Sequence, residues 1–213
     1  MDAGRVTGSA EPDDWSGDRV ERWLRQAAGL ERQLAPVSEL LFAAARLRPG
    51  ESVLDVGCGT GLVGQELRAR GFTGRLLGLD ISQASLDLAR QGGTYDSLRA
   101  ADLQQRLYLD DDSVDAVVCV GVMTYLPEVE AVWREFARVV RPGGVLVTTQ
   151  RDDLWDARNC QSVVDRLTAE RTWTPLEIAG PAPYLPDGYG GTPEVDCYYL
   201  TARVGGAEPT AED

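Results

Sequence analysis

Hydrophobic residues follow two alternating patterns between residues 52 and 204. Short, nearly continuous apolar runs predict strands, and segments with apolar residues three or four positions apart predict helices between them. The predicted strands are 52–56, 76–79, 97–101, 114–120 and 145–149, with further extended segments at 175–179 and 196–204. The predicted helices are 62–70, 83–90 (capped by Ser82), 128–140 and 160–170. This order predicts an α/β fold with a doubly wound, Rossmann-like sheet and right-handed crossovers.

The two ends of the chain differ from its middle. Residues 1–14 and 205–213 are rich in Gly, Ala, Pro and acidic residues, so we expect disordered tails. A single domain is expected over 15–204, divided into an N-terminal helical part at 15–48 and the α/β core at 51–204.

The amino-acid composition excludes several classes of catalytic mechanism. All 21 basic residues are arginine, and the chain has no lysine and no histidine. It therefore lacks the lysine of a pyridoxal phosphate enzyme or a P-loop, and the histidine of a Ser-His-Asp triad or a His-ligated zinc site. The formal net charge of −13 argues against nucleic acid or an anionic membrane as a partner.

The four cysteines, Cys58, Cys119, Cys160 and Cys197, are far apart in the chain and form no CxxC motif. This spacing fits reduced, mostly buried thiols better than a disulfide framework or a metal site. Because the first residues carry no basic segment followed by an apolar stretch, we expect a cytoplasmic protein.

A glycine-rich loop, Asp55-Val56-Gly57-Cys58-Gly59-Thr60-Gly61, joins the first strand to the first helix of the core. Glycines at alternate positions let the backbone turn sharply and approach a ligand closely. Gly59, Gly61 and Gly64 also satisfy the dinucleotide pattern G-x-G-x-x-G.

Two acidic residues favour another ligand. Asp55 would repel a pyrophosphate but suits an ammonium group. Asp80, 19 positions after Gly61, ends the second strand, where its carboxylate can accept hydrogen bonds from ribose hydroxyls. Together they indicate a nucleoside that carries an amino acid.

Residues 53–61 resemble the first motif of the class I S-adenosylmethionine-dependent methyltransferases, and the match continues to Val204. The resemblance implies S-adenosylmethionine as cofactor, S-adenosylhomocysteine as product, and a seven-stranded sheet whose last strand, at 198–203, is antiparallel. A narrower similarity is to the methyltransferases grouped with the Williams-Beuren syndrome region protein. The implied cofactor-binding residues are Asp55, Gly57, Cys58, Gly59, Thr60 and Gly61 in the loop, Asp80, Ile81 and Ser82 beside the ribose, Ala101, Asp102 and Leu103 beside the adenine, and Val120 and Gly121 in the fourth motif.

Several of these residues have a structural alternative. Asp102 can simply cap the next turn, and Cys58 fits a small loop residue better than a nucleophile. Asp115 is expected to face solvent or an arginine and receives no catalytic role. Trp133 and Phe136 share one helical stripe and are expected in the core.

The methyl acceptor is expected near the ends of the fourth and fifth strands, at 121–125 and 150–153. Many small-molecule members of the family carry a histidine in the segment that corresponds to Thr124 and Tyr125, and this chain has none. Tyr125 is the candidate replacement, with Asp152 or Asp153 as the candidate base. Arg151, Asp152 and Asp153 equally fit a solvated loop. The end of the fourth strand carries no acid, so no metal is expected.

Two flanking segments complete the expected site. The N-terminal helices at 18–30 and 37–44 resemble the lid of small-molecule methyltransferases, although permanent packing on the sheet is equally consistent with them. The stretch 172–193, with Trp173, Tyr184 and Tyr189, is interpreted as a long loop that shapes the acceptor pocket.

The sequence therefore predicts a methyltransferase that acts on a small metabolite by in-line displacement, as a monomer or homodimer without nucleic acid or membrane. A protein that binds S-adenosylmethionine without transferring its methyl group, or a cyclase on the same fold, remains open. A nicotinamide oxidoreductase is disfavoured by Asp55 and by the missing Tyr/Lys and histidine pairs.

Overall fold

The computed structural model describes residues 47–185 and 195–205, with only the backbone described at 183–185 and 195. The helices expected at 18–30 and 37–44, and both tails apart from Gly205, lie outside the described residues. The division into a helical lid and a core therefore stays a prediction.

Strands and helices alternate along the described chain. The strands are β1 Ser52–Val56, β2 Arg75–Asp80, β3 Ser97–Ala100, β4 Val114–Cys119, β5 Val140–Arg151, β6 Trp173–Leu185 and β7 Val195–Val204. The helices are α2 Leu62–Ala69, α3 Gln83–Gly92, α4 Val129–Val139, α5 Asp152–Ala157 and α6 Cys160–Ala169, with a 3-10 helix, η2, at Met123–Tyr125. None of these described helices is long and apolar enough to cross a membrane.

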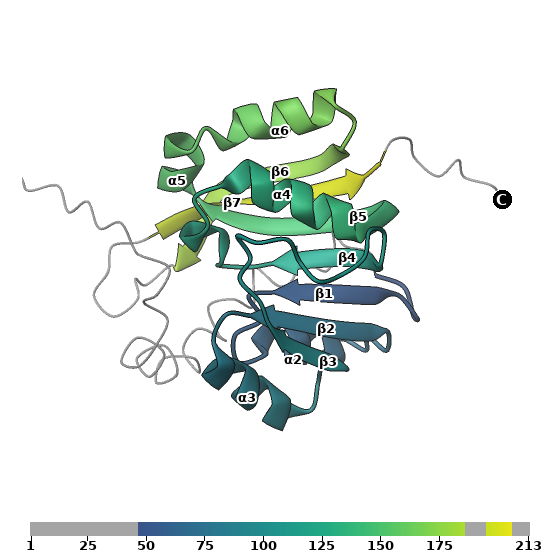
Figure 1. Cartoon of the computed structure of the whole chain (residues 1–213). Helices are drawn as coiled ribbons and strands as arrows, with labels where there is room; N and C mark the ends of the chain where they lie inside the picture. The colour runs from purple at the N-terminus through teal and green to yellow at the C-terminus, as the bar shows by residue number, and fades with distance from the viewer. Residues whose placement is uncertain (1–46, 186–194, 206–213) are drawn as a thin grey trace, which may run out of the picture.

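One seven-stranded sheet forms the centre of the molecule, in the order β3-β2-β1-β4-β5-β7-β6 (Figure 1). The first five strands pair in parallel, and β7 runs antiparallel to both of its neighbours, β5 and β6. The predicted parallel sheet with an antiparallel last strand is confirmed.

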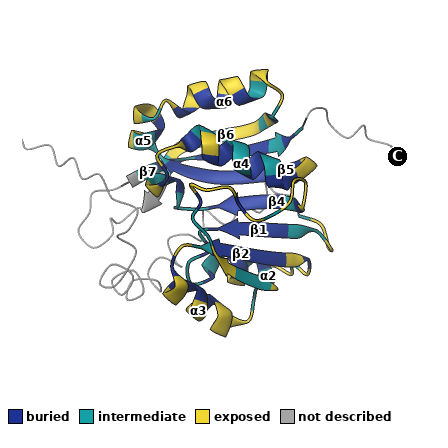
Figure 2. Cartoon of the chain, in the orientation of Figure 1, coloured by how far each residue is buried: buried dark blue, intermediate teal, exposed yellow. Residues whose placement is uncertain are grey.

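Alternate residues of the central strands feed two hydrophobic cores, one on each face of the sheet. Leu54 and Leu77 pack in the core that contains Trp133 of α4. Val53 faces the other way, into the core that contains Leu67 of α2. Figure 2 shows that the inner strands are buried along most of their length. This two-sided burial explains why their sequences are nearly continuous apolar runs, and it confirms the doubly wound arrangement.

The strand order reverses beside β1. The chain adds β2 and β3 on one side of β1 and then places β4 on its other side. The connections after β1 and β4 therefore leave in opposite directions, which opens a crevice at the carboxyl ends of these two strands. Sheets of this kind bind their ligands in such a crevice. The glycine loop, which begins at the end of β1, lies at this point of the fold.

One sequence interpretation is wrong. The interpretation of 172–193 as a long loop is wrong for residues 173–185, where β6 (Trp173–Leu185) pairs with β7 and contains the extended segment expected at 175–179. Residues 186–193, with Tyr189, lie outside the described residues. The prolines and the glycine of β6 concealed its full length. An edge strand tolerates these residues, and the register shifts at Pro175, at 179–182 and at 183–185. Trp173 lies in the core at 5.5 Å from the Trp133 ring, so it does not line an acceptor pocket.

Two further elements differ from the expectation. Strand β5 begins at Val140, five residues earlier than predicted, because Pro142, Gly143 and Gly144 belong to the strand and do not form a separate turn before it. Asp152 and Asp153 begin the short helix α5, so they do not belong to a loop. Trp133 and Phe136 are fully buried in the core, as predicted.

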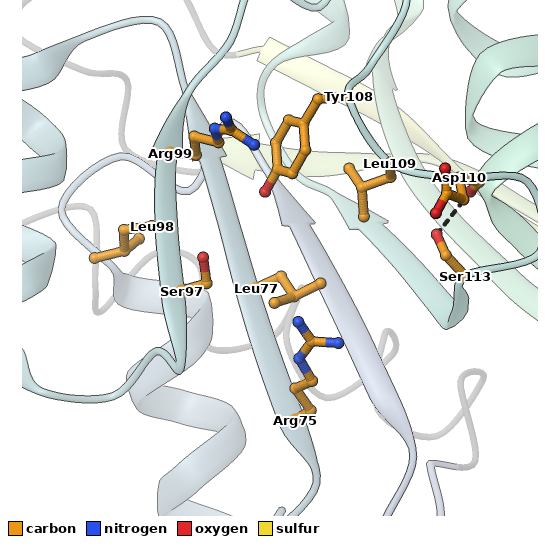
Figure 3. A pocket seen from close by; sticks show the side chains of 9 residues that line it. All are labelled: Arg75, Leu77, Ser97, Leu98, Arg99, Tyr108, Leu109, Asp110 and Ser113. Carbon is orange, nitrogen blue, oxygen red and sulfur yellow. Dashed lines mark hydrogen bonds between the residues drawn. The ribbon is translucent and has the colours of Figure 1, made fainter.

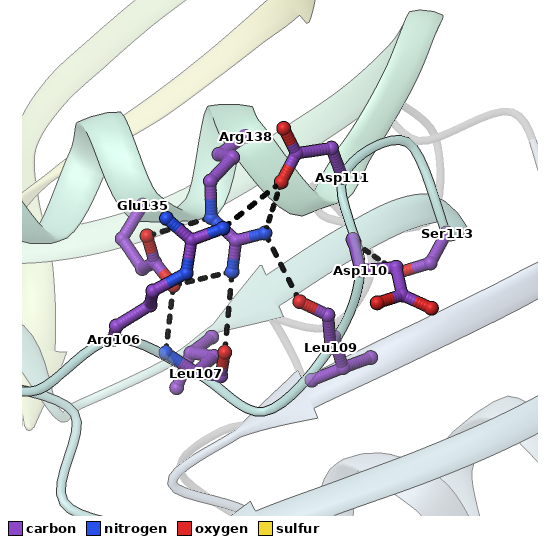
Figure 4. Close-up of polar contacts among 8 residues, drawn as sticks. All are labelled: Arg106, Leu107, Leu109, Asp110, Asp111, Ser113, Glu135 and Arg138. Carbon is purple, nitrogen blue, oxygen red and sulfur yellow. Dashed lines mark hydrogen bonds and ion pairs between the residues drawn. The ribbon is translucent and has the colours of Figure 1, made fainter.

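The connection between β3 and β4 contains no helix and is fastened to α4 (Figure 4). Glu135 accepts a 2.7 Å hydrogen bond from the backbone N–H of Leu107, and Arg138 donates to the carbonyl oxygens of Leu107 and Leu109. Glu135 and Arg138 also form an ion pair, and Arg138 bonds Asp111. Because Glu135 and Arg138 are mostly shielded from solvent, this pair holds the connection more firmly than an exposed pair would.

Candidate cofactor site

The glycine loop is held by backbone hydrogen bonds to the neighbouring strand. The N–H groups of Gly57 and Cys58 both donate to the carbonyl oxygen of Leu79, at 2.7 and 2.9 Å. Gly57 and Gly61 have φ values of 70° and 97°, which L side chains rarely adopt. A Cβ at Gly57 would also overlap the side chain of Val122. The loop therefore needs glycine at these two positions for conformation and for space, and α2 begins directly after it.

Asp80 joins the end of β2 to this loop. Its Oδ2 accepts a 2.9 Å hydrogen bond from the N–H of Gly59, and its Oδ1 accepts a 2.8 Å bond from the N–H of Ser82. Burial raises the pKa of Asp80, and these backbone hydrogen bonds oppose the rise. A carboxylate offers about four acceptor sites. The backbone N–H groups of Ser82, Gly59 and Ile81 occupy part of them, so the group keeps acceptor capacity for a ligand hydroxyl.

Asp55, the first acidic residue of the motif, lies beneath the loop. Its side chain is 1% exposed, and its Oδ2 accepts a 2.6 Å hydrogen bond from the hydroxyl of Tyr95. The pKa of Asp55 is raised to about 7, mainly by burial; the hydrogen bond from Tyr95 lowers it and the charge of Asp80 raises it. Direct contact of Asp55 with a ligand ammonium stays a prediction.

The residues predicted beside the ribose and adenine follow β2 and β3. Ile81 is 46% exposed, which is unusual for a large apolar residue, whereas Ser82 is buried and caps α3 through the N–H of Ser85. Asp102 accepts a 2.9 Å hydrogen bond from the N–H of Gln104, so it does cap the next turn. Leu103 packs in the core. Ala101 is half-buried, and its N–H donates to the carbonyl of Asp80.

Cys58 and Thr60 fill the positions between the loop glycines. Cys58 is buried, and burial first, then the charge of Asp55, raises the pKa of its thiol. A thiol in that state is a poor nucleophile, which supports the interpretation of Cys58 as a small loop residue. Thr60 is half-buried.

The acceptor side is formed where β4 and β5 end. Val120 and Gly121 follow β4, and the N–H of Gly121 donates to Thr149 Oγ1 on β5 at 2.9 Å. Tyr125 ends η2 and is 41% exposed. Asp152 begins α5, and its Oδ1 accepts from the N–H of Asp153. Tyr125 and Asp152 therefore follow neighbouring strands at the same edge of the sheet.

Sequence reasoning missed Arg158, which holds the segment that carries Tyr125. Arg158 follows α5 in the chain, and its guanidinium donates to the backbone carbonyls of Met123, Thr124 and Leu126 at 2.7, 2.9 and 3.1 Å. Burial lowers the pKa of Arg158. No local pattern marks this residue, because its three acceptors lie more than 30 positions away.

Asp115, by contrast, stands near the start of β4 and away from this edge. It accepts hydrogen bonds from the N–H and hydroxyl of Ser52 and pairs with Arg141. The expectation that it faces an arginine is confirmed. Among residues 47–185 and 195–205, no three His, Cys, Asp or Glu side chains are grouped as metal ligands would be.

A surface groove of about 540 Å³ lies elsewhere, over β2 and β3 (Figure 3). Arg75 and Ser97 at the starts of these strands line it, together with Arg99, whose guanidinium lies 4.0 Å from the centre of the Tyr108 ring. None of the predicted site residues lines this groove. It is therefore separate from the crevice at the carboxyl ends.

The crevice residues fit S-adenosylmethionine. The loop has three glycines at positive φ, next to an acidic strand end with spare acceptor capacity and an exposed apolar side chain at Ile81. These features match a ribose with two hydroxyls, an adjacent adenine and an amino-acid end.

Comparisons with known proteins agree with this interpretation. Residues 54–148 match the family model described as "Methyltransferase domain". The human methyltransferase-like protein 27 is 33% identical over 172 residues, which cover 70% of this chain and 66% of that protein. The malonyl-[acyl-carrier protein] O-methyltransferase of Serratia marcescens is 36% identical over 121 residues, which cover 57% of this chain and 45% of that protein.

A solved structure shares the fold. Geranyl diphosphate methyltransferase in complex with S-adenosylmethionine has a TM-score of 0.64 at 19% identity and covers 92% of this chain and 93% of its own. The fold is that of a Rossmann-like α/β protein with a glycine loop at the switch point of its sheet. The chain belongs to the class I S-adenosylmethionine-dependent methyltransferases. The family resemblance of the sequence is thus confirmed. The chain spans about half the length of several curated relatives it matches, such as 45% of the Serratia protein and 43% of a Streptomyces fradiae transposon protein.

Proposed function

We propose that this chain transfers the methyl group of S-adenosylmethionine to a small-molecule acceptor by in-line displacement and releases S-adenosylhomocysteine. The observation that carries the proposal is the link between Asp80 and Gly59, which places a carboxylate with spare acceptor capacity beside the glycine loop at the switch point of the sheet. The cofactor supplies an electrophilic methyl group on a sulfonium.

On the cofactor side, Asp80 would accept hydrogen bonds from the ribose hydroxyls. The backbone of Gly57, Gly59 and Gly61 would surround the methionine portion. The buried Asp55 would add negative charge beneath a cofactor that carries a sulfonium and an ammonium group. Cys58, Thr60, Ser82, Val120 and Gly121 would complete the pocket wall, with Ile81, Ala101, Asp102 and Leu103 around the adenine.

On the acceptor side, Tyr125 would orient the acceptor or form part of the pocket wall. Asp152 would accept a proton from an acceptor that must lose one. Because the chain has no histidine or lysine, a proton lost by the acceptor goes to a carboxylate, a tyrosinate or water. This limit favours an acceptor that is already nucleophilic at neutral pH. Alignment in a site that excludes water would then supply most of the acceleration.

The acceptor class and cellular setting belong to the same proposal. The Serratia relative is named for an oxygen acceptor on a malonyl group, and the acidic chain suits a small metabolite better than nucleic acid. We propose a monomer or homodimer. All four cysteines are unpaired and buried, which supports a reducing, cytoplasmic location.

The experiment is an acceptor screen. The purified chain is incubated with S-adenosylmethionine and a panel of small carboxylic acids, phenols, amines and thiols, and S-adenosylhomocysteine is quantified. Acceptor-dependent release is expected, and Asp80→Ala should abolish it. Tight binding of S-adenosylmethionine without release across the panel would favour a non-transferring protein or a cyclase, and absence of binding would overturn the proposal.

A further inference from the structure

Tyr95, in the connection between α3 and β3, occupies a slot lined by glycines. A Cβ at Gly61 would lie 3.1 Å from the Tyr95 ring and one at Gly78 would lie 3.0 Å from it. A Cβ at Gly64 would overlap the ring outright. These three glycines come from the glycine loop, α2 and β2, so the ring is enclosed by the loop and by two of the elements beside it.

The hydroxyl of Tyr95 connects the two sides of the loop. It donates to Asp55 Oδ2 on β1 at 2.6 Å and accepts a 3.1 Å hydrogen bond from the N–H of Gly64 in the first turn of α2. That N–H has no partner within the helix, and the N-cap residue, Gly61, has no side chain to supply one. Tyr95 therefore provides the cap that α2 lacks and, with the same oxygen, holds the carboxylate of the motif.

We propose that Tyr95 is a positioning residue for the cofactor: its hydroxyl ties Asp55 to the start of α2 and so holds the acidic and glycine parts of the loop in the arrangement that receives the amino-acid end of S-adenosylmethionine. This inference rests on the proposed function. It adds a residue that the sequence motifs do not contain and assigns it a role in recognising the charged end of the ligand.

The charge state of Asp55 predicts the direction in which loss of the Tyr95 hydroxyl changes ligand binding. Asp55 faces Tyr95, Asp80 of β2, the thiol of Cys58 in the loop and the thiol of Cys119 on β4. Burial raises the pKa of Asp55 to about 7, and the hydrogen bond from Tyr95 opposes this rise. Loss of the hydroxyl therefore raises the pKa of Asp55 further and leaves more of it neutral at pH 7. A ligand with an ammonium group then loses an attractive charge.

The test compares Tyr95→Phe, which keeps the ring in its slot, with the unmodified chain by calorimetry. S-adenosylhomocysteine is the probe, and 5′-methylthioadenosine, which lacks the ammonium and carboxylate, is the matched ligand. We expect Tyr95→Phe to bind S-adenosylhomocysteine about tenfold more weakly at neutral pH and 5′-methylthioadenosine with unchanged affinity. The difference should shrink as the pH rises above 7, because a growing share of Asp55 then ionises in both proteins.

Two further variants separate positioning from packing. Asp55→Asn should weaken S-adenosylhomocysteine binding by a similar factor, and adding Tyr95→Phe to it should cost much less than Tyr95→Phe alone, because both act through one carboxylate. Tyr108→Phe changes an exposed tyrosine outside the crevice and should leave both affinities unchanged. Equal loss of both ligands without pH dependence, or no loss at all, would reduce Tyr95 to a packing residue and overturn the inference. Failure of the unmodified chain to bind S-adenosylhomocysteine would instead overturn the proposed function.

Discussion

The carboxylate of Asp80 and the backbone N–H of Gly59 form a 2.9 Å hydrogen bond that joins β2 to the middle glycine of the loop. The bond fixes the loop through a side chain that is itself expected to bind the ligand. Loop order and ligand recognition therefore depend on the same residue.

Asp80→Ala should weaken S-adenosylmethionine binding by roughly 100-fold, because it removes the acceptor for the ribose hydroxyls and releases the Gly59 N–H. Calorimetry measures the effect. Asp87→Ala, on the exposed side of α3 where Asp87 pairs with Arg90, is the matched control and should bind normally. Unchanged affinity in Asp80→Ala would contradict the role of Asp80 as the acceptor for the ribose hydroxyls.

Asp55→Asn should stabilise the folded protein at neutral and alkaline pH. The pKa of Asp55 rises from 3.8 to about 7 on folding, so the folded state binds more protons than the unfolded state between these values. The free energy of unfolding of the unmodified chain therefore falls as pH rises through that window. Asp55→Asn removes the titrating group, so the variant should be more stable at neutral pH by on the order of 3 kcal/mol. Thermal unfolding across the pH range measures the difference, which should vanish below about pH 4.

Asp115→Asn provides a control of opposite sign for that experiment. Burial tends to raise the pKa of Asp115, but hydrogen bonds from Ser52 and Arg141 outweigh it and lower the pKa. Its ionised form therefore stabilises the folded protein above the unfolded-state pKa, and the variant should be less stable at neutral pH. Stabilisation by both substitutions would contradict the burial argument for Asp55.

Arg158→Lys should impair turnover more than cofactor binding. A lysine keeps the charge but cannot span the three carbonyls of Met123, Thr124 and Leu126 with one planar fork. The segment that carries Tyr125 should loosen and lower kcat/KM for the acceptor about tenfold, with an unchanged Kd for S-adenosylhomocysteine. Arg166→Lys on α6, where the side chain forms an exposed pair with Glu130, is the control. An equal effect of the two substitutions would remove Arg158 from the site.

Tyr125→Phe should lower kcat for the acceptor by about tenfold and leave the Kd of the cofactor within twofold or so. The side chain is exposed at the end of η2, beyond β4, so it lies on the predicted acceptor side and outside the core. Steady-state kinetics with an acceptor from the screen, together with calorimetry, separate the two quantities. An unchanged kcat would show that the hydroxyl does not act on the acceptor, so that Tyr125 contributes no more than surface to the pocket.

The parallel half of the fold could be predicted because its strands are buried on both faces. The strand expected at 114–120 is β4 at Val114–Cys119, and that at 52–56 matches β1. The antiparallel half was less visible. Strand β7 was expected at 196–204 and lies at Val195–Val204, but only 175–179 of β6 was expected. The three prolines and one glycine of β6 are typical of a loop, and only pairing with β7 identifies the whole segment as a strand. Helix α5 has six residues, too few for a periodic pattern.

The candidate site divides in the same way. Its glycines and Asp80 are detectable because their chemistry and spacing are local to the chain. Tyr95 and Arg158 are not, because each acts on partners 30 or more positions away through contacts that exist only after folding. Tyr95 carried one indirect signal: Gly64, in the middle of a helical turn, left space that a tertiary neighbour had to fill.

The burial of all four cysteines makes the molecule convenient for spectroscopy. Cys58 and Cys119 have strongly raised thiol pKa values because of burial, and burial raises those of Cys160 and Cys197 to about 11. A maleimide dye at neutral pH should therefore not react with the native thiols. It should label only an introduced surface cysteine, such as Glu128→Cys at the start of α4. Ligand-dependent changes near the acceptor side can then be followed with one fluorophore and no removal of native residues.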